Sequence, residues 1–283
     1  MYAYFNDEII DLRKGVIQLQ NRCYTFGDGL YEVLRIIDGV PVFFEEHLNR
    51  LKKSADYFEI KIESSREIKR KVDNLIRIND FSSGELYIQL SRGTDLFREH
   101  GIKSLESIVS ILTIPLRNIN EDNWISGAKV VSFPDMRHGF CNHKTVNLFA
   151  NVQAKSYAYS NDAYEAIMYR SDSNGKYVTE GGSSNYFFVK SNDVYTPEVD
   201  NILPGITREK TISLLQEMGE NVVQKRFYFD EIKDADEIFL VSTVSKIMPV
   251  KIVDDFSFKI GEKTLKLIKR FEEMIKEYKK SRK

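Results

Sequence analysis

Alternating apolar and polar residues predict short strands in the first part of the chain. Asn6-Asp7 and Asp38-Gly39 are turn pairs that tolerate a positive φ and so join two strands in a hairpin. The predicted strands are residues 2–5 with 8–10, residues 30–37 with 40–44, and then residues 85–91 and 107–114. These segments predict an antiparallel sheet near the beginning of the chain.

The strand over residues 30–37 has two chemically different faces. Its period of two places Leu30, Glu32, Leu34 and Ile36 on one face and Tyr31, Val33 and Arg35 on the other. The mixed face that carries Tyr31 and Arg35 is the one suited to lining a site.

A spacing of three and four residues then predicts helices. The first has an apolar stripe, with Arg50 off it, made of Leu48, Leu51, Ala55 and Phe58. Ser64 and Glu67 have the spacing of a capping box that opens a second helix, whose inner face consists of Ile68, Val72, Leu75 and Ile76.

A polar segment with little apolar pattern separates the two halves of the chain. We therefore expect a small α/β domain over residues 1–117, a linker over 118–127 and a second domain over 128–283. In the second domain the pattern predicts strands over 128–133, about 165–169, 177–179, 185–189, 193–196 and 237–241, and a helix over 147–159. The predicted fold class is α/β (α+β) with two domains.

Two more helices are predicted in the second domain. One begins after Leu203-Pro204-Gly205-Ile206, with Thr207 as the N-cap and with Ile212 and Leu215 pointing inward. The last helix shows apolar residues at 265, 268, 275 and 278.

Composition and charge narrow the classes of partner. The 283 residues include 41 basic and 42 acidic ones, a net charge of −1, so a nucleic acid is not expected as a partner. No run approaches the roughly 18 apolar residues of a membrane span. The two cysteines, Cys23 and Cys141, have neither metal-site spacing nor the number typical of a disulfide framework. We expect a cytoplasmic protein without a metal site.

Several residues are candidates for anion binding. The helix start at Ile206 and Thr207 offers free backbone N–H groups to a phosphate. Ser242 and Thr243 add hydroxyl groups, and Arg50 adds a permanent charge. An ordinary capped helix and a surface arginine remain the simpler interpretation of this pattern.

Other residues are candidates for catalysis. Lys144 follows one predicted strand and precedes a helix, where partial desolvation makes an amine nucleophilic. Glu180 lies in a glycine- and serine-rich loop that a ligand can approach. Arg98 and His100 place two cations in one loop, a pair suited to a carboxylate. Solvated loops are the alternative for the last two features.

Taken together, these segments resemble the fold type IV pyridoxal-phosphate enzymes, and among them the D-amino-acid aminotransferases. The matching segments occur in the family's order at residues 26–33 (FGDGLYEV), 46–51 (EHLNRL), 98–100 (REH), 144–147 (KTVN), 179–185 (TEGGSSN), 203–208 (LPGITR) and 242–243 (ST). The ordered set is much more specific than any one segment.

The resemblance implies the cofactor pyridoxal 5'-phosphate and a role for each matched residue. Lys144 matches the lysine that binds the cofactor covalently and moves the substrate proton, and Glu180 matches the carboxylate that faces the pyridine nitrogen. Leu203 matches the residue packed on the ring. The implied phosphate site consists of Arg50, Ile206, Thr207, Ser242 and Thr243.

The resemblance also implies a substrate site and a homodimer. The implied substrate residues are Tyr31, Val33, Arg98, His100 and Ser183, with the Arg98 and His100 loop completing the site of the neighbouring subunit. The implied reaction transfers the amino group of a D-amino acid, such as D-alanine or D-glutamate, to a 2-oxo acid such as 2-oxoglutarate. The alternatives of the same fold are a branched-chain L-amino-acid aminotransferase and an aminodeoxychorismate lyase, and a ligand-binding protein without catalysis is the alternative of another class.

Overall fold

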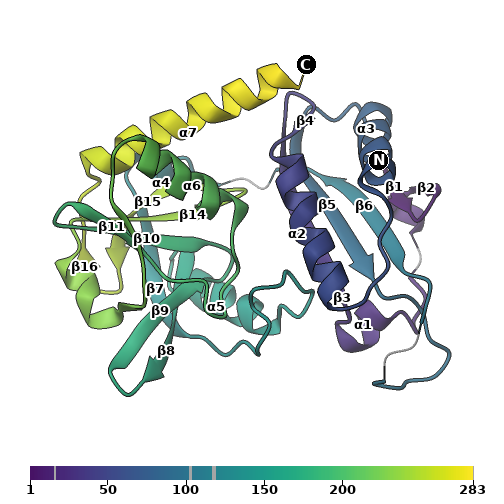
Figure 1. Ribbon diagram of the computed structural model, residues 1–283, viewed down its shortest axis with the longest axis horizontal. Coiled ribbons are helices and arrows are strands. Elements are labelled where there is room, and N and C mark those ends of the chain that lie inside the picture. The colour runs from purple at the N-terminus through teal and green to yellow at the C-terminus, as the bar shows by residue number, and fades with distance from the viewer. Residues whose placement is uncertain (16, 102–103, 117–118, 283) are drawn as a thin grey trace. The chain divides into compact units, whose positions relative to one another are not determined.

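The structure is a computed structural model that describes residues 1–15, 17–101, 104–116 and 119–282. The chain divides into two compact units, which Figure 1 colours along the sequence. The first unit comprises Met1–Arg117, His143–Asn147 and Arg282–Lys283, and the second comprises Asn118–Asn142 and Leu148–Ser281. The predicted boundary between residues 117 and 118 falls on two residues that lie outside the described ranges.

The first unit is a six-stranded antiparallel sheet in the order β2-β1-β6-β5-β3-β4. Its described elements are β1 (Tyr2–Phe5), β2 (Glu8–Asp11), η1 (Leu12–Lys14), α1 (Arg22–Phe26), β3 (Gly29–Ile37), β4 (Val40–Pro41), α2 (Phe44–Tyr57), α3 (Ser65–Ile78), β5 (Ser83–Ser91) and β6 (Ile108–Ile114). Both predicted hairpins are present. The second strand of the second hairpin ends earlier than predicted, because Phe43 takes a left-handed conformation and α2 begins at Phe44.

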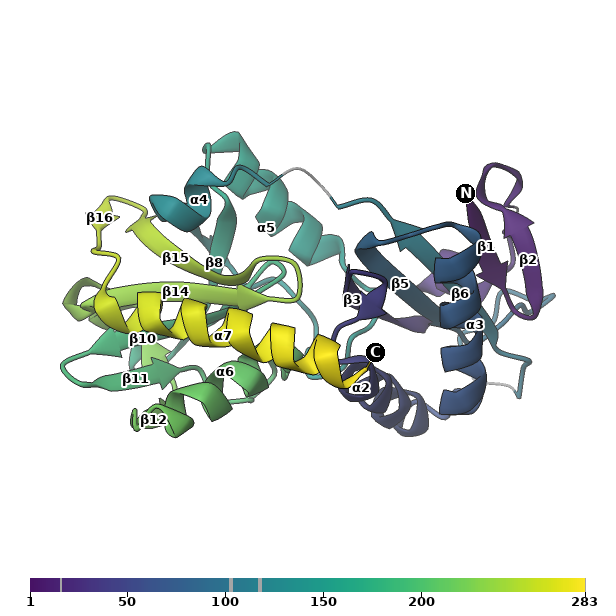
Figure 2. The same ribbon diagram turned by 90° about the horizontal axis from the view of Figure 1, so that it is seen from above.

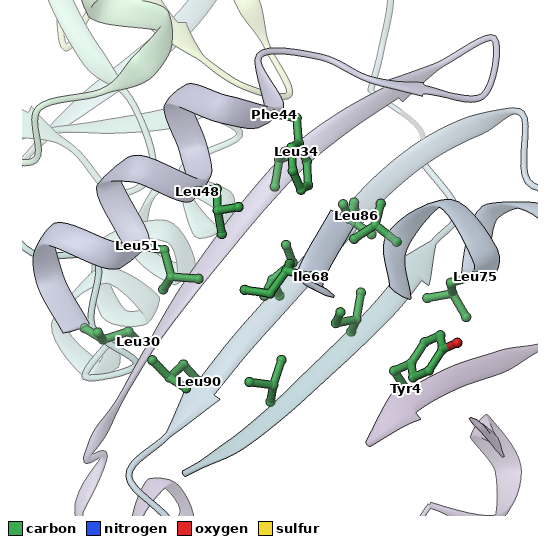
Figure 3. Packing of buried hydrophobic residues seen from close by; sticks show 14 of the residues in the cluster. Tyr4, Leu30, Leu34, Phe44, Leu48, Leu51, Ile68, Leu75, Leu86 and Leu90 are labelled. Atoms are coloured by element: carbon green, nitrogen blue, oxygen red, sulfur yellow. The ribbon is translucent and has the colours of Figure 1, made fainter. Parts of the chain in front are cut away.

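The core of the first unit lies between the sheet and helices α2 and α3. Figure 3 shows Leu48 and Leu51 of α2 pointing toward Leu30 and Leu90 on the strands. The predicted alternation in β3 is confirmed, since Leu30, Glu32, Leu34 and Ile36 are buried while Tyr31, Val33 and Arg35 are half-buried. The Ser64 hydroxyl accepts a hydrogen bond from the Glu67 amide, so the predicted cap of α3 is present. The mixed face of β3 is therefore left for a site.

The second unit is built on a ten-stranded mixed sheet. Its path is β12-β11-β10-β14-β15-β7-β8-β9-β13, with β16 paired to β15. Its described elements are α4 (Asp122–Ile125), β7 (Ala128–Pro134), α5 (Phe149–Ser160), β8 (Glu165–Asp172), β9 (Gly175–Gly181), β10 (Asn185–Lys190), β11 (Asp193–Thr196), α6 (Ile206–Glu217), β12 (Val222–Gln224), β13 (Phe227–Tyr228), η2 (Phe229–Asp234), β14 (Glu237–Ser242), β15 (Lys246–Val253), β16 (Phe256–Ser257) and α7 (Glu262–Ser281). Helices α6 and α7 pack against β14, whereas α5 packs against β7 and β8 (Figure 2).

Two details of the predicted helices were wrong. Gly205, and not Thr207, is the N-cap of α6, so Thr207 lies within the first turn. The buried stripe of α7 consists of Thr264, Leu267, Phe271 and Ile275, while Leu265 is 52% exposed. The few apolar residues of α7 can be assigned to either of two neighbouring faces of the helix. Packing against the sheet decides which of the two faces is buried. No described helix is long and apolar enough to cross a lipid bilayer.

Candidate active site

Lys144 lies against Tyr31 in the first unit. Its Nζ atom is 3.2 Å from the Tyr31 hydroxyl and 4.3 Å from the centre of the Tyr31 ring. Lys144 is half-buried, and no described carboxylate forms an ion pair with it. A lysine amine held by a neutral hydroxyl is available to bind a ligand or to carry a proton.

The backbone of residues 143–147 is anchored to β3 and to the turn before it. The Tyr31 amide donates to the carbonyl of Lys144 at 3.0 Å, and the Val146 amide donates to the carbonyl of Gly29 at 3.1 Å. Asn147 Nδ2 donates to the carbonyl of Gly27 at 2.9 Å. Gly27 has a φ of 68°, and a Cβ there would lie 2.3 Å from Asn147 Oδ1. Glycine at this turn therefore allows the lysine segment to approach.

Glu32 lies on the opposite face of β3 from Tyr31. Its carboxylate contacts two side chains of α2, Arg50 and His47. Arg50 donates from Nε and Nη2 at 2.8 Å each, and His47 Nδ1 is 2.7 Å from the same carboxylate. These partners lower the pKa of Glu32 to about 2 although burial opposes the shift. Burial lowers the pKa of His47, so the imidazole is neutral near pH 7. Arg50 is thus fixed in place on α2.

Arg98 and His100 pack side by side against Phe26 of α1. The guanidinium of Arg98 is 4.9 Å from the centre of the Phe26 ring, and the rings of His100 and Phe26 are 5.1 Å apart. Both side chains are exposed. Within the described ranges, neither residue has a hydrogen bond or ion pair with Tyr31 or Lys144. The structure therefore brings Arg98 and His100 together, and Lys144 and Tyr31 together, as two separate groups.

A pocket of about 350 Å³ opens beside α1 in the first unit. His100 lines it together with Phe26, Thr145 and Asn147, and Phe58 and Ile60 supply an apolar wall. His100 and the segment that follows Lys144 thus face one hollow.

Glu180 is the central carboxylate of the second unit. It accepts hydrogen bonds from Asn185 Nδ2 at 3.0 Å and from the Leu203 amide at 3.2 Å, and it pairs with Arg137. Arg137 also donates to Asp135, whose carboxylate contacts Arg170 as well. Burial raises the pKa of Glu180, and the nearby Arg137 opposes this shift without cancelling it.

Asn185 connects Glu180 to the predicted phosphate residues of this unit. It donates to the carbonyl of Leu203 at 3.1 Å, and a Cβ on Gly205 would lie 2.2 Å from its Oδ1. Asn185 is also the register partner of Val241, the residue before Ser242. Gly205 therefore lets the uncapped start of α6 approach the ends of β10 and β14.

The start of α6 has the properties of an anion site. Its first amides have no partner within the helix, and Gly205 provides no side-chain cap. Thr207 is buried in the first turn. Ser242 accepts from the Ser245 amide at 2.9 Å, which tightens the turn that carries Thr243. Leu203, Gly205 and the end of β14, which are far apart in the sequence, thus come together at Asn185.

Ser183 has a defined partner in the same unit. Its hydroxyl donates to the buried carboxylate of Glu165 at 2.8 Å, and Ser184 donates to the same oxygen at 3.4 Å. Lys155 lies 3.3 Å from the other oxygen of Glu165. The Ser183 hydroxyl therefore donates its proton to Glu165. The lone pairs of the hydroxyl oxygen and the backbone amide of Ser183 can still bind a ligand.

Sequence reasoning did not single out the partners that hold these residues. Glu32 carries a usable signal, because it is a charged residue on the apolar face of a strand, and such a residue needs a buried partner. Arg137 and Glu165 stand in segments without a distinguishing pattern. Of the described His, Cys, Asp and Glu residues, no group of three or more is arranged to hold a metal ion.

Comparison with known proteins identifies the class of protein. Residues 29–253 match the family model described as amino-transferase class IV. The chain belongs to the class IV aminotransferase family, which confirms the aminotransferase class expected from the sequence.

Individual relatives agree with this assignment. The chain is 36% identical to D-alanine aminotransferase of Bacillus licheniformis over 256 residues, which cover 90% of this chain and 89% of the relative. The fold matches that of the Escherichia coli branched-chain amino acid aminotransferase, with a TM-score of 0.89, 24% identity, and coverage of 97% of this chain and 94% of the other. It also matches 4-amino-4-deoxychorismate lyase from Pseudomonas aeruginosa, with a TM-score of 0.84, 20% identity, and coverage of 96% and 98%.

Proposed function

We propose that the protein is a pyridoxal 5'-phosphate-dependent D-amino-acid transaminase that acts on a substrate such as D-alanine or D-glutamate, with a 2-oxo acid such as 2-oxoglutarate as acceptor. The observation that carries this proposal is the Lys144 amine, 3.2 Å from the Tyr31 hydroxyl and without a described carboxylate partner. The similarity to a D-alanine aminotransferase over 90% of the chain supports the choice of substrate.

The residues of the second unit fit a phosphorylated pyridine cofactor. The start of α6 and the turn at Ser242 and Thr243 would hold the phosphate, together with Arg50 of the first unit. Glu180 would face the pyridine nitrogen, and Leu203 would pack on the ring. Only glycine at position 205 leaves room for the start of α6 next to Asn185.

Bound pyridoxal phosphate supplies an aldehyde that takes up the amino group and an electron-poor ring that accepts the electrons of the substrate Cα–H bond. Lys144 Nζ carries the Cα proton, and the Tyr31 hydroxyl orients that amine. The Glu180 carboxylate, paired with Arg137, would accept a hydrogen bond from the ring nitrogen and so hold the proton there. Arg98, His100 and Tyr31 bind the substrate carboxylate, and Val33 and Ser183 line the space around it.

We further propose a cytoplasmic homodimer in which the loop of Arg98 and His100 completes the neighbouring site. Leu96 and Phe97, in the same loop, are 74% and 62% exposed, and a second subunit would cover such side chains. Cys23 and Cys141 are free thiols, as expected in a reducing compartment.

A substrate panel tests the proposed reaction. The purified protein, supplied with pyridoxal phosphate, is incubated with 2-oxoglutarate and either D-alanine or L-leucine. Formation of pyruvate from D-alanine is the expected result. Turnover of L-leucine alone would contradict the proposal and favour the branched-chain aminotransferase, while release of pyruvate from aminodeoxychorismate alone would favour the lyase.

One variant and one chemical labelling experiment test the role of Lys144. Lys144→Ala should lose about 10³-fold or more in kcat, because it removes the proton carrier. Borohydride reduction of the wild-type protein should attach the cofactor to the peptide containing Lys144, which mass spectrometry detects. Wild-type activity of Lys144→Ala, or a label on another lysine, would overturn this assignment.

Mixed dimers test the proposed sharing of the loop. At a low concentration of D-alanine, Lys144→Ala subunits alone should show no turnover and Arg98→Met subunits alone only little, because loss of Arg98 raises KM. If the loop serves the neighbouring site, unfolding and refolding the two variants together should restore activity, because some dimers then contain one intact site. No recovery in co-refolded dimers would show that each subunit uses its own loop.

A further inference from the structure

Arg22 is a buried arginine of α1 that lines the pocket beside His100 and has no role in the reaction proposed above. Its side chain is 4% exposed, whereas Arg98 and His100 are exposed. Arg22 Nε donates to Asp28 Oδ2 at 2.7 Å. The other end of its guanidinium donates to the carbonyl of Glu99 at 2.8 Å and to that of His100 at 3.4 Å.

The ring of Phe26 contacts the side chains of Arg22, Arg98 and His100. Arg22 lies 4.7 Å from its centre, Arg98 lies 4.9 Å from it, and the ring of His100 is 5.1 Å away. Arg22 also donates from its backbone amide to the carbonyl of Gly93 at 2.9 Å, at the beginning of the loop. The segment from Gly93 to His100 is therefore held to α1 near both of its ends.

Asp28 in turn is anchored from the other side. Arg92 Nε donates to the same Asp28 oxygen at 2.8 Å, and its guanidinium donates to the carbonyls of Phe58 and Glu59 at 2.9 and 3.2 Å. The side chains of Arg22 and Arg92 are thus similarly buried and share one carboxylate. Among the described contacts, the Arg22 side chain bonds to the carbonyls of Glu99 and His100, whereas the Arg92 side chain bonds to those of Phe58 and Glu59.

We propose that Arg22 is a positioning residue for recognition of the substrate carboxylate, an inference that rests on the proposed function of Arg98 and His100. The planar guanidinium fixes the backbone at Glu99 and His100, and Asp28 fixes the guanidinium. Arg22 itself does not contact the substrate. Because Asp28 belongs to the turn that also anchors residues 146 and 147, Arg22 aligns the loop with the same turn that positions the lysine segment.

The chain provides a matched pair of variants. Arg22→Lys keeps a charge near Asp28 and Phe26 but cannot reach both carbonyls of the loop. We expect KM for D-alanine to rise about tenfold and kcat to change less than about threefold, since the lost hydrogen bonds position a binding group only. Arg92→Lys disturbs the same carboxylate and should leave KM within about threefold of the wild-type value.

A double variant separates positioning from general destabilisation. Once Arg98 is replaced by Met, Arg22→Lys should add little to the rise in KM, because both substitutions act on one recognition step. Multiplication of the two effects would overturn the proposal. An equal rise in KM for Arg92→Lys and Arg22→Lys would overturn it too, because the effect would then belong to the Asp28 turn.

A measurement without substrate completes the test. Amide hydrogen exchange in the peptide containing Glu99 and His100 should be faster in Arg22→Lys and unchanged in Arg92→Lys. If Arg22→Lys does not fold, Arg22→Gln, which keeps two side-chain N–H donors, takes its place in both assays.

The failure of this proposal can be distinguished from the failure of the proposed function. If the wild-type protein does not turn over D-alanine, the proposed function is refuted. If the wild type is active and the Arg22 variant has an unchanged KM and unchanged amide exchange, only the role of Arg22 is refuted.

Discussion

Glu32 in the first unit and Glu180 in the second are both buried and both pair with an arginine, yet their pKa values move in opposite directions. The pKa of Glu32 is lowered to about 2, and that of Glu180 is raised. Glu32 receives a two-pronged contact from Arg50 and a further contact from His47. Glu180 shares Arg137 with Asp135, and its remaining donors are the neutral groups of Asn185 and Leu203.

The difference shows what each carboxylate can do. Glu32 already accepts two hydrogen bonds from the charged Arg50 and contacts His47, so it fixes Arg50 and has little capacity for another cation. The charge of Glu180 is incompletely compensated, because burial raises its pKa more than Arg137 lowers it, and the negative charge of Asp135 adds to the rise. A further positively charged proton donor, such as a pyridinium, would stabilise the charged form of this buried carboxylate.

The largest effect should come from Arg137→Met. This substitution leaves the carboxylates of Glu180 and Asp135 with less compensation in a buried site, which typically costs about 3–5 kcal/mol in the free energy of unfolding. Denaturant unfolding measures the change. Arg170→Met is the control, because Arg170 contacts Asp135 but not Glu180 and is more exposed. Equal stability of the two variants would mean that Glu180 does not depend on Arg137.

Glu32→Gln should have the next largest effect, and its size should depend on pH. The pKa of Glu32 falls from the ordinary 4.5 to about 2 on folding, so its ionised form stabilises the protein above about pH 4.5 and this contribution is lost as the pH falls toward 2. The wild type should therefore exceed the variant by on the order of 3 kcal/mol at pH 7, and the difference should disappear near pH 2.

The comparison for this prediction is Glu67→Gln on α3, where an exposed pair with Arg70 should contribute at most about 1 kcal/mol. Thermal unfolding of the three proteins between pH 2 and 7 provides the data. A constant difference between wild type and Glu32→Gln over that range would show that the Glu32 charge is not selectively stabilised by folding.

Asn185→Ala should have the smallest effect of the three. It removes one neutral donor from Glu180 and leaves the Leu203 carbonyl without its side-chain partner, a loss of about 1–2 kcal/mol in stability. The pKa of Glu180 should rise further, which moves the acidic limb of the pH–rate profile to higher pH. An acidic limb that stays in place would indicate that Arg137 alone controls the charge of Glu180.

Much of the fold could be predicted from local patterns. The alternation in β3 predicted which residues are buried, because one face of that strand meets α2 and α3. The face of α7 could not be predicted in the same way, since residues 264, 267, 271 and 275 compete with residues 265, 268, 275 and 278 for the apolar stripe. The N-cap of α6 was misplaced for a related reason: threonine is the better cap in isolation, but close packing against Asn185 requires glycine.

The sequence by itself identified the ordered set of segments that contains Lys144, Glu180 and the start of α6, because each segment carries residue types that its chemistry needs. Only the tertiary structure showed their partners. Arg22 meets Glu99 across 77 positions, Arg92 meets Asp28 across 64, and Arg137 meets Glu180 across 43. Residue type determines which charge a position carries, whereas the pKa and direction of that charge depend on desolvation and on neighbours that only folding brings within a few ångströms.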